Sequence, residues 1–108
     1  MSITINIYYS GKGDNALNFA KEMESSGTAK AIREEKGNLS YEYFTSLSDK
    51  STVLLVDSWE SQEALDIHHS SPMMEKITNL REKYDLHMKV KRYIDSSDNN
   101  SDDKFIRK

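Results

Sequence analysis

The chain has 108 residues, an apolar fraction of 36% and a formal net charge of −3 at neutral pH. This length supports one domain with a thin core. The absence of cysteine excludes disulfides, thiolate nucleophiles and zinc–thiolate sites, and the mixed charges argue against a nucleic-acid partner. Because the sequence starts without the pattern of a signal peptide and has no apolar run of roughly 20 residues, we expect a cytoplasmic protein without membrane contact.

The first elements follow from side-chain alternation and turn residues. Residues 3–9 alternate isoleucine with polar residues, which predicts a strand. Asp14 is expected to cap a helix with one apolar face. Residues 28–36 are interpreted as an extension of that helix, and Gly37 suits the left-handed position after its last turn.

The second half of the chain repeats this order. Residues 39–47 alternate, and residues 53–56 within the expected strand at 52–59 are apolar on both sides, which predicts a hairpin whose second strand is central. A serine-capped helix is expected at 62–69, and Pro72 opens another helix. Residues 86–91 predict an edge strand with one dry face and one charged face.

The element order β-α-β-β-α-β predicts an α+β, ferredoxin-like fold, with a four-stranded antiparallel sheet and its helices on one side. Residues 1–94 form this domain, and the polar composition of residues 95–108 predicts a disordered tail. The sheet face away from the helices keeps apolar side chains. We therefore expect a second copy to cover it, which gives a homodimer.

Three side chains are candidates for chemistry. His68 can take and return a proton near neutral pH, and it shares a helix face with Leu65, three residues earlier. Trp59 can form a flat wall and donate one hydrogen bond. Asn6 is unusual in a strand and lies opposite the isoleucines. Each also has a purely structural interpretation, as a surface histidine, a core tryptophan and a locally satisfied amide.

Metal and phosphate chemistry have no support in the sequence. His68 and His69 are adjacent rather than four residues apart, and no histidine and carboxylate recur at ligand spacing. No glycine-rich phosphate loop is present. We therefore expect no metal.

The most specific pattern comprises Trp59-Glu60-Ser61, Ala64-Leu65-Asp66, His68 and Pro72. Together with Gly37-Asn38-Leu39-Ser40-Tyr41, it resembles the antibiotic biosynthesis monooxygenase domain family over residues 3–93. The resemblance implies a dimeric α+β barrel. It also implies cofactor-independent oxidation of a small quinol or hydroxylated aromatic substrate by O2.

By this resemblance, His68 holds the substrate proton while Asn6 and Trp59 stabilise the oxyanion, and the three converge on one cavity. We expect four further residues to contact the substrate: Tyr8, Leu65, Met73 and Ile77.

The chain also departs from the family pattern. Many relatives have a histidine directly after the proline, where this chain has Met73. The axial histidine of the haem-degrading branch is replaced by Thr78-Asn79, which disfavours haem degradation. Two other functions stay open, a non-catalytic ligand-binding or stress-response module and an isomerase on the same scaffold.

Overall fold

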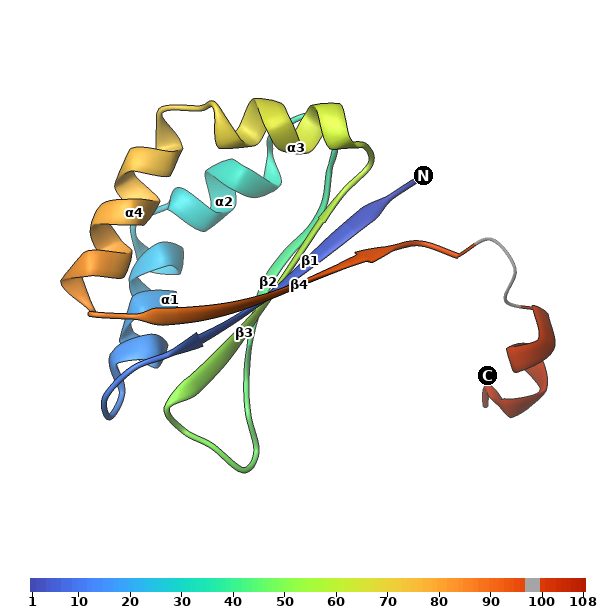
Figure 1. Cartoon of the computed structure of the whole chain (residues 1–108), viewed down its shortest axis with the longest axis horizontal. Coiled ribbons are helices and arrows are strands. Elements are labelled where there is room, and N and C mark those ends of the chain that lie inside the picture. The colour runs from blue at the N-terminus through green and yellow to red at the C-terminus, as the bar shows by residue number, and fades with distance from the viewer. Residues whose placement is uncertain (97–99) are drawn as a thin grey trace.

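The computed structural model describes residues 1–96 and 100–108, and its chain forms one sheet with a layer of helices (Figure 1). In chain order the elements are β1 (Ile3–Ser10), α1 (Asn15–Ser25), α2 (Thr28–Arg33), β2 (Asn38–Thr45), β3 (Thr52–Trp59), α3 (Gln62–His69), α4 (Met73–Lys83), β4 (His87–Ile94) and the short 3-10 helix η1 (Asn100–Phe105).

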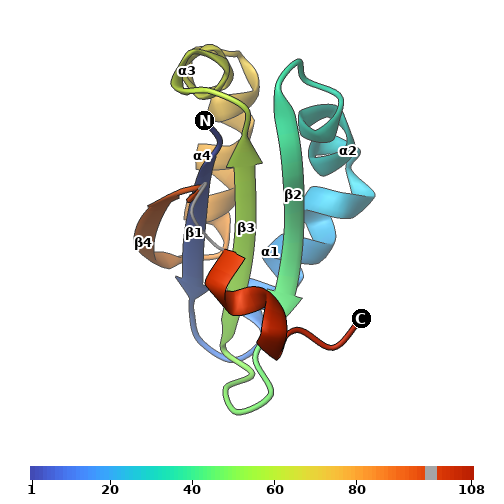
Figure 2. The ribbon, with the colours of Figure 1, turned by 90° about the vertical axis from the view of Figure 1, so that its right-hand side faces the viewer.

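The sheet has the strand order β2-β3-β1-β4, and every neighbouring pair is antiparallel. Helices α1 to α4 lie on one side of it, as the two perpendicular views show (Figures 1 and 2). This arrangement confirms the ferredoxin-like α+β fold and the central position of β3. Among the residues that the structure describes, no helix is both long and apolar enough to cross a membrane.

Strand register decides which residues enter the core. Ile3 pairs with Trp59, and Ile7 pairs with Leu55, so these four side chains point to the helix layer, where they are buried. The even-numbered residues of both strands point to the opposite, open face of the sheet, because strand side chains alternate. Thr4 and Ser58, for example, share a hydrogen bond of 2.8 Å on that face.

Local turn chemistry is partly as expected. Ser61 accepts a hydrogen bond from the backbone of Ala64 at the start of α3, and Gly37 has a φ of 89°, both as predicted. Asp14 makes no side-chain capping bond, so that prediction is wrong. Residues 28–36 do not extend α1 either, because Gly27 takes a φ of 80° and starts α2 in a new direction.

Strand β4 is an edge strand, as predicted, but it has no dry face in the single chain. All eight of its residues are exposed, including Met88 at 41% and Val90 at 53%. The prediction of one dry face is wrong here because the helices pack on β1, β2 and β3. In the predicted tail, residues 97–99 lie outside the described part of the chain, and η1 follows them. Disorder of the tail stays a prediction.

Candidate active site

His68 lies in the last turn of α3 and points into the molecule. It is 3% exposed, and Leu65 on the same helix face is 2% exposed. The imidazole stacks on the indole of Trp59, with ring centroids 4.8 Å apart and planes 25° apart. The two rings that the sequence singled out are therefore in direct contact beneath the helix layer.

The indole N–H of Trp59 is already bonded. It donates to Oδ1 of Asp57 over 2.7 Å, and both residues are buried on the helix side of β3. Burial raises the pKa of Asp57 to about 6, although the hydrogen bond from Trp59 opposes this rise. In this arrangement Trp59 offers a flat ring face to its surroundings, while its single donor serves the carboxyl of Asp57.

On its other side His68 meets Glu35, which follows α2. Nδ1 of His68 lies 2.8 Å from Oε2 of Glu35, and the Glu35 side chain is 20% exposed. The loop that carries Glu35 is held against β3 and α3, since the backbone N–H of Glu60 donates to the carbonyl of Gly37 over 2.8 Å. A Cβ at Gly37 would lie only 2.6 Å from that of Ala64, so this close approach requires glycine.

Buried tyrosines continue the polar surroundings of Asp57 along the sheet. The hydroxyl of Tyr9 accepts two hydrogen bonds from Arg81, at 3.1 and 3.0 Å. The hydroxyls of Tyr41 and Tyr43 lie 3.0 Å apart. Burial is the main cause that raises the pKa of all three phenols, so they remain protonated at neutral pH.

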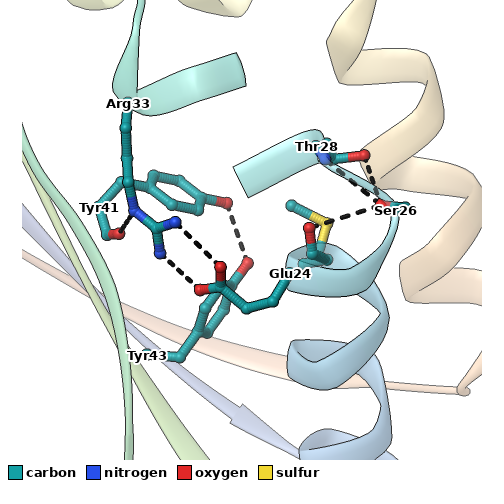
Figure 3. Close-up of polar contacts among 7 residues, drawn as sticks. Glu24, Ser26, Thr28, Arg33, Tyr41 and Tyr43 are labelled. Carbon is teal, nitrogen blue, oxygen red and sulfur yellow. Dashed lines mark hydrogen bonds and ion pairs between the residues drawn. The ribbon is translucent and has the colours of Figure 1, made fainter. Parts of the chain in front are cut away.

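Tyr41 is also fixed from outside the core (Figure 3). Arg33 donates from Nε to the backbone carbonyl of Tyr41 over 2.7 Å, and its guanidinium pairs with Glu24 at the end of α1. Ser26 and Thr28 share a hydrogen bond of 2.8 Å at the turn between α1 and α2. These contacts join α1, α2 and β2 on the side of the helix layer that carries the loop to Glu35.

Asn6 and Tyr8 do not join this group. They pair with Val56 and Leu54 and therefore point to the open face, whereas Trp59 points to the helices. The expectation that Asn6 converges with Trp59 and His68 on one cavity is wrong, because the two sets lie on opposite faces of the same sheet. Oδ1 of Asn6 is buried and has no hydrogen-bond partner among the described residues.

The remaining predicted residues lie on the helix side. Leu65 and Ile77 are each 2% exposed and belong to the core, and Met73 is half-buried against it. His68 and Trp59 are thus packed among side chains. A surface depression of about 340 Å³ lies beside Glu35; its lining residues are Glu35, Lys36, Glu60, Ser61, Glu63, Ala64 and Ile67.

Two residues of this site were missed in the sequence. Asp57 stands in the alternating series with Leu55 and Trp59, and that spacing could have indicated a buried carboxyl. Glu35 falls within residues 28–36, which were predicted only as an extension of the first helix, and nothing in that segment marks it as part of a site. No metal site adds to these groups: within residues 1–96 and 100–108, no three histidine, aspartate or glutamate side chains form a cluster that could hold an ion.

The chain belongs to the antibiotic biosynthesis monooxygenase family, because the family model matches residues 2–79. No curated protein sequence matches the chain. The fold is shared with solved structures of low sequence identity. A protein from Deinococcus radiodurans assigned to the antibiotic biosynthesis monooxygenases is 20% identical, with a TM-score of 0.76 over 90% of this chain and 94% of its own.

Two further structures are similar. The protein PA3566 from Pseudomonas aeruginosa is 16% identical, with a TM-score of 0.74 over 89% of this chain and 95% of its own. SnoaB, a cofactor-independent oxygenase from Streptomyces nogalater, is 14% identical in one of its structures, with a TM-score of 0.71 over 89% of this chain and 94% of its own. At these identities the likeness establishes the fold.

Proposed function

We propose that this protein is a cofactor-independent monooxygenase that oxidises a small quinol or hydroxylated aromatic compound with O2. The proposal rests on one observation: in this member of the family, the buried imidazole of His68 lies between Trp59 and Glu35. The description of SnoaB as a cofactor-independent oxygenase supports the same class of reaction.

The proposed chemistry needs one base and a site that excludes water. His68 removes a proton from the hydroxylated ring system, and the resulting anion passes an electron to O2. The two radicals combine at a ring carbon that carries one hydrogen, the peroxide anion takes the proton back from His68, and loss of water leaves a carbonyl. One oxygen atom enters the product, the other leaves as water, and the substrate supplies all four electrons. Packing around the imidazole limits competing hydrolysis.

Oxygen uptake with a panel of quinols and hydroxylated polycyclic compounds tests this function. The His68→Gln variant is expected to lose at least about 100-fold in kcat/KM, because proton transfer by a positioned side chain contributes on that order. The matched control is His69→Gln, which replaces the neighbouring exposed histidine and should keep the rate within about twofold. A chelator and removal of free flavin should leave wild-type uptake unchanged.

Equal rates for wild type and His68→Gln on every responsive substrate would contradict the assigned role of His68. A non-catalytic ligand-binding module is the second candidate, and the tight packing of Trp59 and His68, at 0% and 3% exposed, favours it. That function predicts a raised melting temperature with a bound aromatic ligand and no oxygen uptake.

We also propose that the protein acts as a homodimer whose two sheets meet through their open faces. That face carries the half-buried side chains of Tyr8, Leu54 and Val56 next to Phe44, which is 44% exposed. Asn6 lies on the same face, and its Oδ1 is buried without a hydrogen-bond partner among the described residues.

Sedimentation velocity tests this assembly. Wild type is expected at twice the mass of one chain, and Phe44→Glu is expected to weaken the dimer at least about tenfold, because it places a charge in an apolar contact. Leu47→Glu is the matched control, since Leu47 projects fully from the turn between β2 and β3. A wild-type protein that stays monomeric at high concentration would overturn the proposal.

A further inference from the structure

Glu35 is the side chain that determines which ring nitrogen of His68 carries the hydrogen. Its Oε2 lies 2.8 Å from Nδ1 of His68. A carboxylate can only accept a hydrogen bond, so Nδ1 carries the hydrogen of the neutral imidazole. The lone pair then lies on Nε2, to which no described residue makes a hydrogen bond.

We propose that Glu35 is the positioning residue of the site: it holds His68 in the tautomer whose Nε2 can take a proton and stabilises the imidazolium that forms. Part of this inference rests on the proposed function, since the proton that Nε2 receives is that of the substrate. The tautomer itself does not depend on any substrate. It follows from the contact between the two side chains.

No other charged group near the imidazole is placed for this task. On β3, Asp57 accepts the indole N–H of Trp59; the charge of His68 lowers the pKa of Asp57, but no hydrogen bond joins its carboxyl to the imidazole among the described residues. On α3, His69 has its ring 5.7 Å from that of His68. On α4, Arg81 donates to the hydroxyl of Tyr9. Glu35 alone among these groups makes a hydrogen bond to the ring of His68.

The backbone next to Glu35 is held in position by contacts of Gly37. Gly37 contacts α3 so closely that a single added carbon would overlap Ala64, and its carbonyl is bonded to Glu60. The backbone at Glu35 is therefore held in place relative to α3, the helix that carries His68. The depression of about 340 Å³ on its outer side gives the carboxylate contact with water, while the imidazole remains 3% exposed.

Ring nitrogen-15 NMR tests the tautomer on the full chain without any substrate. In wild type we expect the neutral imidazole of His68 to carry its hydrogen on Nδ1. Glu35→Ala should move most of the population to the Nε2–H form, which a free imidazole prefers. Glu34→Ala is the matched control, because it removes the adjacent exposed carboxylate and should leave the His68 tautomer unchanged.

The isosteric variant Glu35→Gln tests the same role in case Glu35→Ala does not fold. It keeps the size of the side chain but lacks the charge, so we expect at least about a tenfold lower kcat with KM within about twofold, and a shifted pH profile of kcat. Glu35→Asp is expected to recover part of the rate. A residue with a merely structural role would lower stability without moving the tautomer or the pH profile.

The outcomes separate the two proposals. If no compound in the panel is oxidised by wild type but the tautomer changes in Glu35→Ala, the proposed function fails and the role of Glu35 in setting the imidazole stands. If wild type carries its hydrogen on Nε2, or if Glu35→Ala and Glu35→Gln both leave the tautomer unchanged, the inference about Glu35 is overturned whatever the activity.

Discussion

Replacing Trp59 by alanine is expected to lower the free energy of unfolding by about 3–5 kcal/mol. The indole is fully buried, stacks on His68, and donates its only hydrogen bond to Asp57. The alanine variant would leave a large cavity and a buried carboxyl without its donor, and both effects act in the same direction. Urea denaturation followed by circular dichroism at fixed protein concentration measures the loss.

Two further variants separate the causes. Trp59→Phe keeps an aromatic ring against His68 but removes the N–H, so it should cost about 1–3 kcal/mol. Leu47→Ala, at a fully exposed turn position, should change stability by less than about 0.5 kcal/mol. A loss below about 1 kcal/mol for Trp59→Ala would mean that the indole does not support the core as its burial indicates.

Asp57→Asn is expected to change the pH dependence of stability by about 3 kcal/mol. In the folded state burial raises the pKa of Asp57 to about 6, against an ordinary value of 3.8, which is a difference of about two pH units. The raised pKa means that this group contributes stability below about pH 4 and that the contribution is lost as the pH rises through about 6. Asparagine does not titrate and can still accept the indole N–H.

The stability of Asp57→Asn relative to wild type should therefore increase by about 3 kcal/mol between about pH 4 and about pH 8. Urea titrations across this range measure the difference, in which the contributions of ionisable groups that do not interact with Asp57 cancel. Asp66→Asn, at an exposed position of α3, is the matched control and should differ from wild type by less than about 0.5 kcal/mol throughout. If the stability difference between Asp57→Asn and wild type did not change with pH, the pKa of Asp57 would not be raised by burial.

The fold was predictable because the spacing of apolar residues in a strand shows which of its faces are buried. The alternation in residues 3–9 indicated a strand, and the two-sided apolar run at 53–56 indicated a central one; the sheet order confirms the central position of β3. The break between α1 and α2 was missed, although Gly27 stands at the turn. An apolar helix pattern can continue across such a break, so only the positive φ of Gly27 distinguishes two helices from one.

The site was predictable in part. Trp59 and His68 were correctly placed together, but Asn6 was added to them without the strand register, in which Ile3 rather than Asn6 shares a face with Trp59. Glu35 could not be placed from local pattern at all. It lies 33 residues before His68, and their contact depends on how the loop at Gly37 packs on α3.

The single tryptophan of this chain lies against the proposed base. Tryptophan emission, excited selectively over the six tyrosines, therefore originates at one known point, with a carboxyl on the indole nitrogen and an imidazole on the ring face. Changes in charge on either neighbour, or an aromatic guest that quenches the indole, register in the same optical signal. The molecule carries its own probe of the place where its chemistry is proposed to happen, and no label has to be attached.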